Sequence, residues 1–244
     1  MTTFVLVHGA WHGAWCWQPL VDSLGRVGAV SEAPDLPGHG DDQTPIDQLT
    51  LADYADAVAA VLRSADEPVV LVGHSLGGLV ISEAAERVPE KVSTLVYLCA
   101  LMLSDGESPF DVMGSDPEAE LLTSVVPSSD GLAITVDPAA VAGLFYADCQ
   151  PPVQAWATAR LAAEPIGPPM TPVHVTATRW GSLPRSYIVC TQDRAISPDQ
   201  QQAMIDRTGV DSVVRIDASH SPFLSKPDDL ASALIDIANR GSGM

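Results

Sequence analysis

A serine flanked by glycines has the spacing of a catalytic nucleophile. Residues 73–77 read Gly-His-Ser-Leu-Gly, a G-x-S-x-G motif with Ser75 at its centre. An apolar run, 68–72, precedes the motif and a helix-like segment follows it, which is the strand–turn–helix setting that this motif requires. Such a turn crowds the backbone, so glycine is needed two residues on either side of the serine. The pattern predicts Ser75 as a nucleophile and the N–H of Leu76, at the start of the helix, as an oxyanion donor.

A nucleophilic serine needs a histidine that accepts its proton and a carboxylate that fixes the tautomer of that histidine. His220 lies in the loop after the last predicted strand, 211–216, and Asp193 follows the predicted strand 186–191. Catalytic groups of open α/β sheets gather at the carboxyl ends of strands, and for this motif the chain order is serine, acid, histidine. The order therefore predicts Asp193 and His220 as the partners of Ser75.

Three other residues compete for these two roles. His174 lies in a proline-rich segment and His39 lies in a loop after an earlier strand, so neither ends a late strand. Asp217 follows the last strand, but it is too close to His220 in sequence to suit the expected order. We expect all three outside the triad.

The first apolar run leads directly into a second loop of interest, which contains His8, Gly9 and Ala10. An acyl-transfer site needs a second N–H donor, usually from a loop after an early strand, and Ala10 is the candidate. The spacing of His8 and His12 also fits a zinc site, but neither a third ligand nor an H-E-x-x-H helix accompanies them. We expect both histidines to hydrogen-bond the loop backbone, and we expect no metal or organic cofactor.

Strand-like and helix-like patterns alternate along the chain and would position these loops. Short apolar runs predict strands, and apolar residues at helical spacing predict helices. This alternation implies βαβ crossovers and an α/β fold, with a mostly parallel sheet covered on both faces. The strands are expected at 4–7, 27–33, 68–72, 92–98, 186–191 and 211–216, and the helices at 17–24, 51–63, 77–88, 198–207 and 226–239.

The segment 104–185 departs from this alternation. It is rich in proline and shows no strand of the main sheet, yet its apolar side chains need burial. A structureless loop of this length is implausible in a compact domain. We therefore expect a cap, residues 104–185, inserted into an α/β core of residues 1–103 and 186–244. The predicted substrate contacts are Gly9 and Trp11 of the first loop and Phe110 and Trp156 of the cap.

Composition excludes several classes of protein. The 244 residues suit one domain with a modest insertion, and the formal net charge of −19 disfavours binding to nucleic acid or to an anionic membrane surface. No apolar run reaches the roughly 18 residues of a membrane-spanning helix, and no signal peptide is expected. The four cysteines form no C-x-x-C pair, which predicts free, buried thiols in a reducing cytoplasm. The tail 241–244 is expected to be disordered.

Four stretches together resemble the α/β-hydrolase superfamily. Within it they are most similar to the branch of plant methylesterases, which act on methyl salicylate and methyl jasmonate, and of α-hydroxynitrile lyases. The stretches span nearly the whole chain: 4–17 (FVLVHGAWHGAWCW), 73–78 (GHSLGG), 187–193 (YIVCTQD) and 219–222 (SHSP). The resemblance implies the α/β-hydrolase fold and a serine hydrolase that needs no cofactor.

The resemblance also bears on the choice between an esterase and a lyase. Lyases of this branch carry a threonine after the first-loop histidine and a lysine after the catalytic histidine, which serve cyanohydrin binding and cyanide departure. Gly9 and Ser221 occupy these positions here, so the chain is similar to an esterase. We expect hydrolysis of a small hydrophobic or aromatic ester of the methyl type through an acyl-enzyme on Ser75.

Two kinds of alternative stay open at this point. A fold does not determine chemistry, so a lyase, lactonase, C–C hydrolase or cofactor-free oxygenase on the same scaffold is the first. A protein that binds a small ligand and hydrolyses it slowly is the second. The sequence also leaves open the natural substrate and the formation of a homodimer.

Overall fold

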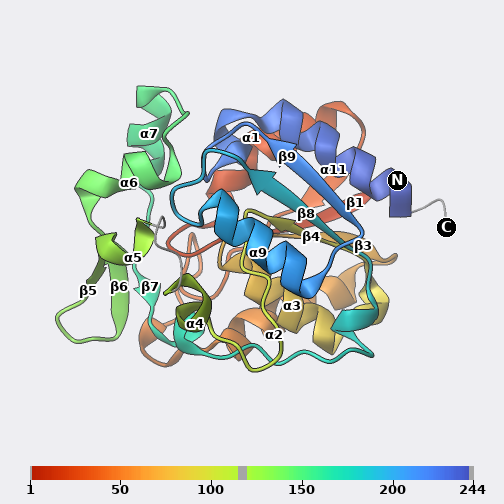
Figure 1. Cartoon of the computed structure of the whole chain (residues 1–244), viewed down its shortest axis with the longest axis horizontal. Coiled ribbons are helices and arrows are strands. Elements are labelled where there is room, and N and C mark those ends of the chain that lie inside the picture. Colours follow the sequence, from red (N-terminus) through yellow and green to blue (C-terminus); the bar gives the residue numbers. More distant parts are fainter. Residues whose placement is uncertain (1, 115–119, 242–244) are drawn as a thin grey trace.

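The computed structural model describes residues 2–114 and 120–241, without the side chains of Phe110 and Asp111. Within these residues, six parallel strands form one sheet in the order β2-β1-β3-β4-β8-β9 (Figure 1). Of the tail 241–244, for which disorder is predicted, Gly241 instead ends the last helix, and residues 242–244 lie outside the described residues. The strands are β1 (Thr3–Val7), β2 (Val30–Glu32), β3 (Val69–His74), β4 (Val92–Leu98), β8 (Arg185–Cys190) and β9 (Ser212–Ile216).

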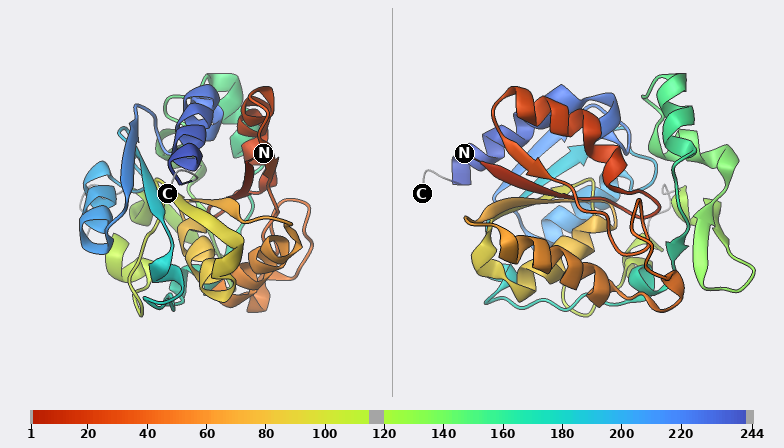
Figure 2. Two further views of the ribbon diagram at one scale, coloured as in Figure 1. Left: turned by 90° about the vertical axis from the view of Figure 1, so that its right-hand side faces the viewer. Right: turned by 180° about the vertical axis from the view of Figure 1, so that it is seen from behind.

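Helices cover both faces of this sheet (Figure 2). One face packs against α1 (Gln18–Arg26) and α11 (Pro227–Gly241), and the other against α2 (Leu51–Ser64), α3 (Gly77–Arg87) and α9 (Pro198–Thr208). Every residue of β3 is buried, which explains why the central strands read as continuous apolar runs rather than alternating ones. The remaining short elements of the core are η1 (Ala14–Trp17), η2 (Ile46–Gln48), η3 (Pro89–Lys91) and α10 (Pro222–Ser225). None of the described helices is long and apolar enough to cross a bilayer.

The predicted elements of the core are confirmed, with differences at their ends. The strand expected at 27–33 is the largest difference, because only Val30–Glu32 is extended. Gly28 adopts a left-handed conformation after α1, with φ of 78°, and β2 pairs only with β1 at the edge of the sheet. The helix expected from residue 17 instead begins as a 3-10 turn, and α1 follows with Pro19 in its first turn.

The cap lies beyond one end of the main sheet (Figure 1). Its described part gives no strand to that sheet, as predicted, and forms a separate three-stranded antiparallel sheet. Pro138 and Pro151 each begin a helix of the cap, where a missing N–H costs nothing. The cap elements are α4 (Pro109–Met113), α5 (Leu121–Ser124), β5 (Val125–Pro127), β6 (Ala133–Val136), α6 (Pro138–Phe145), α7 (Pro151–Thr158), β7 (Glu164–Pro165), α8 (Gly167–Met170) and η4 (Trp180–Ser182). The boundaries 104–185 stay a prediction.

The last part of the cap, residues 171–183, runs back along α3 to the start of β8 (Figure 1). Two carboxylates of α3 hold its backbone. Glu83 Oε1 accepts the N–H of His174 at 2.7 Å, and Glu86 Oε2 accepts the N–H groups of Thr176 at 2.9 Å and Trp180 at 3.1 Å. This stretch therefore fastens the cap to the core at a distance from the carboxyl ends of the strands.

Candidate active site

Ser75 occupies a strained turn between β3 and α3. Its φ is 53°, in the left-handed region that costs a non-glycine residue about 1–3 kcal/mol. The predicted need for glycine on both sides is confirmed. A Cβ on Gly73 would lie 2.5 Å from the Gly77 carbonyl oxygen, and a Cβ on Gly77 would lie 2.7 Å from that of His8. The turn places Ser75 at the carboxyl edge of the sheet, where it lines a cavity.

Asp193 and His220 meet in the loops that follow β8 and β9. The Nδ1 atom of His220 lies 2.7 Å from Asp193 Oδ2, and both side chains are buried. Asp193 Oδ1 accepts the backbone N–H groups of Ala195 at 2.8 Å and Ile196 at 3.0 Å. Because a carboxylate only accepts, Nδ1 carries the proton and Nε2 has a free lone pair. This is the tautomer that a general base requires.

His74 connects the serine turn to the histidine loop. Its Nε2–H donates to the His220 carbonyl oxygen at 2.8 Å, and the Cys99 thiol donates to the same oxygen at 3.4 Å. Burial lowers the pKa of His74 well below its usual range, so the ring is neutral. Ligand atoms of His74, Cys99 and His220 lie within 4.8 Å of one another, but the first two already serve to hold the His220 backbone.

The two residues predicted to supply oxyanion donors line the same cavity as Ser75. Ala10 follows β1, and Leu76 follows the serine. Neither N–H donates to any acceptor within residues 2–114 and 120–241, and Ser75 Oγ also makes no hydrogen bond there. Catalytic hydrogen bonds are often long until substrate binds. The arrangement leaves one nucleophile and two donors available to a ligand.

The cavity at Ser75 has a volume of about 410 Å³ and lies between the core and the cap. Its described lining is almost entirely apolar, with aliphatic side chains such as Leu101, Met113, Ile134 and Ile196. Trp11 is the one aromatic residue of that lining. Such a site favours an apolar ligand with few polar groups.

The four predicted substrate contacts differ in where the structure places them. Trp11 lines the cavity, whereas Gly9 packs behind it, and a Cβ there would lie 2.7 Å from the Ser75 Cβ. Trp156 does not line it: the residue is 37% exposed and its ring packs edge-on against Trp15, with centroids 5.3 Å apart. Phe110 belongs to α4, but its side chain lies outside the described part of the chain, so its contact stays a prediction.

The first-loop histidines bind the backbone, as expected. Nδ1 of His8 donates to the Gly9 carbonyl oxygen at 2.9 Å, and Nδ1 of His12 donates to that of Ala10 at 2.8 Å. Burial lowers the pKa of both rings, that of His12 to about 4, so both are neutral. Their remaining nitrogens accept hydrogen bonds from the N–H of Leu36 and the hydroxyl of Tyr146.

The rival residues lie in other environments. The His174 side chain is 74% exposed beside Asp105, and Asp217 accepts from Thr191 and Gln192 at the surface. His39 is buried, and its Nε2 lies 2.9 Å from Glu164 Oε2. None of the three contacts Asp193, His220 or Ser75.

Several polar residues around the site carry no sequence motif. Gln201 of α9 is fully buried and donates to Asp193 Oδ2 at 3.2 Å and to the Ile196 carbonyl oxygen at 2.8 Å. Tyr146 and Glu164 of the cap contact the first loop. Only Gln201 had a usable signal, because its position in the helix pattern of 198–207 falls on the buried face.

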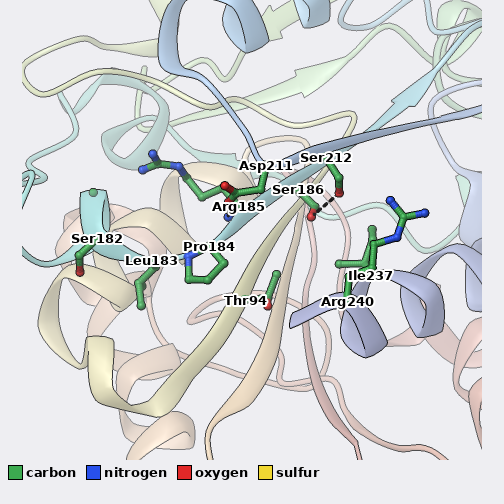
Figure 3. Close-up of a pocket in the computed structure, with 11 residues that line it drawn as sticks. Thr94, Ser182, Leu183, Pro184, Arg185, Ser186, Asp211, Ser212, Ile237 and Arg240 are labelled. Carbon is green, nitrogen blue, oxygen red and sulfur yellow. Dashed lines mark hydrogen bonds between the residues drawn. The ribbon is translucent and has the colours of Figure 1, made fainter. Parts of the chain in front are cut away.

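A second cavity, also of about 410 Å³, lies at the opposite, amino ends of β4, β8 and β9. Its two arginines point away from each other (Figure 3), so they do not converge on one ligand. The Arg185 guanidinium lies 4.4 Å from the centre of the Trp180 ring, and the hydroxyls of Ser186 and Ser212 bond each other at 2.8 Å. Its described lining pairs no nucleophile with a base.

Comparison with known proteins agrees with this geometry. A family model described as "Alpha/beta hydrolase family" matches residues 4–233. Putative methylesterase 14 of Arabidopsis thaliana is 36% identical, covering 96% of this chain and 71% of that protein. Methylesterase 1 of the same plant is 35% identical, covering 97% and 96%. A crystal structure of a tomato methylketone synthase I variant complexed with beta-ketoheptanoate superposes with a TM-score of 0.87 at 30% identity, covering 98% of both chains.

Proposed function

The chain belongs to the α/β-hydrolase family, and from that premise we propose how it hydrolyses small esters: through a triad of Ser75, His220 and Asp193. The resemblance to plant methylesterases and the α/β-hydrolase fold, both expected from the sequence, are confirmed. The observation that carries the proposal is Ser75 on its left-handed turn beside an apolar cavity.

The reaction begins when Ser75 Oγ attacks the ester carbonyl carbon and His220 Nε2 takes the hydroxyl proton. The N–H groups of Ala10 and Leu76 bind the resulting oxyanion, each contributing about 3–4 kcal/mol. Asp193 stabilises the imidazolium and holds its orientation. His220 then gives its proton to the leaving alcohol, and a water activated in the same way releases the acid. These steps need no cofactor.

The substrate is a small ester with a hydrophobic acyl group. The aliphatic lining supports an alkyl or aryl acyl part, and the names of the methylesterase relatives support a small leaving alcohol. Position 9 argues against cyanohydrin cleavage. A threonine Cβ there would lie 2.7 Å from that of Ser75, so the loop would have to shift before its hydroxyl could reach a ligand.

The expected compartment and partners of the chain are inferred from its composition. The four cysteines are free and buried, which supports our inference of a reducing compartment such as the cytoplasm. The net charge of −19 supports a small-molecule partner rather than nucleic acid. A homodimer stays a prediction.

The test of the proposed function is turnover of a panel of methyl and short acyl esters by the wild type and by Ser75→Ala. We expect turnover in the wild type and a loss of at least about 1,000-fold in the variant. Mandelonitrile cleavage is measured in parallel. Ordinary turnover by Ser75→Ala would refute the nucleophile, and cyanide release without ester hydrolysis would favour a lyase.

A further inference from the structure

The peptide between Ala10 and Trp11 is held at both of its polar ends. The Trp11 N–H donates to Glu164 Oε2 at 3.1 Å, and the Ala10 carbonyl oxygen accepts from His12 Nδ1 at 2.8 Å. Trp11 has a φ of 63°, so the loop adopts a conformation that a bulky residue disfavours. Such strain persists only where surrounding contacts impose it.

The neighbouring peptide is held on one side only. The Gly9 carbonyl oxygen accepts from His8 Nδ1 at 2.9 Å and from the N–H of His12 at 3.4 Å. The N–H of that same peptide belongs to Ala10, and it donates to no acceptor in the described part of the chain. The bonds on either side therefore restrain one free donor, in a residue that lines the same cavity as Ser75.

Glu164 comes from the cap, 153 residues after Trp11. It is fully buried, and the other groups that hold it belong to the core: His39 Nε2 at 2.9 Å and the Tyr54 hydroxyl at 3.2 Å. The cap contacts Trp11 twice more, since the indole Nε1–H donates to the Ile134 carbonyl oxygen at 3.0 Å and the Trp11 carbonyl oxygen accepts the N–H of Ala162 at 2.9 Å. Trp11 is therefore a main point of contact between the cap and the first loop, beside the bond between Tyr146 and His12.

The charges of this cluster suit a site at which an oxyanion develops. A lone buried carboxylate near the hole would oppose the growing negative charge. Burial lowers the pKa of His39, but its bond to Glu164 and the charge of that carboxylate outweigh this, and the pKa is raised. Both ring nitrogens of His39 face acceptors, Nδ1 the Pro37 carbonyl oxygen at 3.3 Å and Nε2 the Glu164 carboxylate at 2.9 Å, an arrangement that suits the protonated ring. In that form His39 neutralises Glu164, which keeps its acceptor function without a net charge.

We propose that Glu164 is a positioning residue of the oxyanion hole. From the cap, its carboxylate holds the N–H of Trp11, and this keeps the N–H of the adjacent residue, Ala10, directed at the substrate carbonyl. Glu164 lines the cavity at Ser75, but both of its oxygens already accept hydrogen bonds from the loop and the core, so we assign it a role through the loop rather than on the substrate. The inference rests on the proposed function, because it assumes that Ala10 is an oxyanion donor.

The experiment compares Glu164→Ala and Glu164→Gln with the wild type on one methyl ester. Losing the bond to Trp11 lets the loop relax, and we expect Glu164→Ala to lower kcat by about 10- to 100-fold while KM changes less than about 3-fold. Glu164→Gln keeps an oxygen that accepts from Trp11 and should recover kcat to within about 5-fold of the wild type. An alkyl trifluoromethyl ketone, which forms a tetrahedral adduct with serine, should bind Glu164→Ala more weakly by the same factor as kcat.

Glu86→Ala is the matched control. Glu86 also holds backbone N–H groups of the cap, but it lies at the far end of α3, roughly 15 Å of helix from Ser75. This variant should lose stability and keep kcat and trifluoromethyl ketone affinity. A merely structural role for Glu164 would give the same result for both carboxylates, with a lower melting temperature and unchanged kcat.

Two further variants keep the outcomes separable. If Glu164→Ala does not fold, Glu164→Asp keeps the charge and withdraws the oxygen from Trp11 by one methylene, and kcat should still fall about 10-fold. Wild-type kcat in a folded Glu164→Asp overturns the proposal. Ser75→Ala is measured beside them: Ser75-dependent turnover with a normal Glu164→Ala rejects only the positioning role, whereas Ser75-independent turnover rejects the proposed function.

Discussion

Both carboxylate oxygens of Asp193 accept hydrogen bonds, and these bonds determine how an asparagine side chain would be oriented in its place. Oδ1 accepts two backbone N–H groups, so the amide oxygen of an asparagine would occupy that site. The amide nitrogen would then face His220 and donate to Nδ1, which forces the proton onto Nε2. We predict that Asp193→Asn lowers kcat by about 10,000-fold with a native fold, because the histidine is held in the wrong tautomer.

Steady-state kinetics and circular dichroism check this prediction. Asp217→Asn is the matched control, since Asp217 is an exposed carboxylate in the neighbouring loop that bonds Thr191 and Gln192. It should keep wild-type kcat. Equal activities of the two variants would remove Asp193 from the triad.

Gly9 supports the site by lacking a side chain. A Cβ at this position would lie 2.7 Å from the Ser75 Cβ and 3.0 Å from the backbone oxygen of His74, and neither neighbour can move freely. We predict that Gly9→Ala pushes the first loop away from the serine turn, lowers kcat by about 100-fold and costs about 1–3 kcal/mol of stability.

The control for this change is Gly25→Ala, because a Cβ on Gly25 meets nothing within 4 Å. Gly25 lies in α1, where alanine is the better helix former, so stability should stay the same or rise. Kinetics and urea unfolding of both variants separate crowding at the serine turn from a general effect of losing a glycine. A fully active Gly9→Ala would contradict the close packing of loop and turn.

At the scale of elements, α2 begins with a complete capping box. The Thr50 hydroxyl accepts the N–H of Asp53 at 3.4 Å, and the Asp53 carboxylate accepts the N–H of Thr50 at 2.8 Å. We predict that Thr50→Ala costs about 1 kcal/mol and lowers the melting temperature by about 2–4 °C. Calorimetry checks this, and kcat should not change. A drop in kcat larger than about 3-fold would mean that α2 helps to shape the cavity.

The core elements were predictable because their signals are local. Parallel strands buried on both faces give unbroken apolar runs, and Gly28 and Pro19 only shifted the ends of β2 and α1. The cap was predictable as an insertion but not in its detail. Its strand β7 has two residues, and its place is set by pairing with β6, which no local pattern reveals.

The residues of the candidate site also differ in whether a local sequence pattern predicts them. Ser75, Asp193 and His220 could be named because a motif and the rule of strand ends fix them, whereas Glu164 reads as an ordinary exposed glutamate in the sequence. Its burial depends on His39 and Tyr54, more than a hundred residues away. Trp156 was expected at the cavity as an apolar residue of the cap, but its ring packs against that of Trp15 and is partly exposed.

At the scale of the whole molecule, buried neutral histidines make stability depend on pH. Burial lowers the pKa of His8, His12 and His74 in the folded protein, and each would titrate near 6.5 when unfolded. Below pH 6.5 the unfolded chain binds more protons than the folded protein. The free energy of unfolding therefore decreases as the pH is lowered, by about 1.4 kcal/mol per pH unit for each histidine. His39 has the opposite sign: its raised pKa stabilises below about pH 6.5, and that contribution is lost as pH rises through the folded pKa.

Below about pH 6.5 His39 is protonated in both the folded and the unfolded state and adds no pH dependence, so the three buried neutral histidines predict a net loss of stability between pH 6.5 and pH 5. Urea unfolding at pH 6.5, 6 and 5 should show a midpoint that drops at each step. His174→Gln removes an exposed histidine and should leave this dependence unchanged. A midpoint that is flat from pH 6.5 to pH 5 would mean that the three rings are not held neutral.

The position of Glu164 has a consequence for the timing of a catalytic cycle. Because β7 belongs to the cap, any movement that lifts the cap from the core also withdraws the carboxylate from Trp11. With the cap open, the nucleophile Ser75 would still be in place but the oxyanion hole would be disordered, so the solvent-filled site would be inactive. The contacts that an ester makes with the cap would bring cap and core together, and the same closure would order the oxyanion hole. Substrate binding and the ordering of the oxyanion hole would thus depend on the same closure, which favours ligands large enough to contact both the cap and the core.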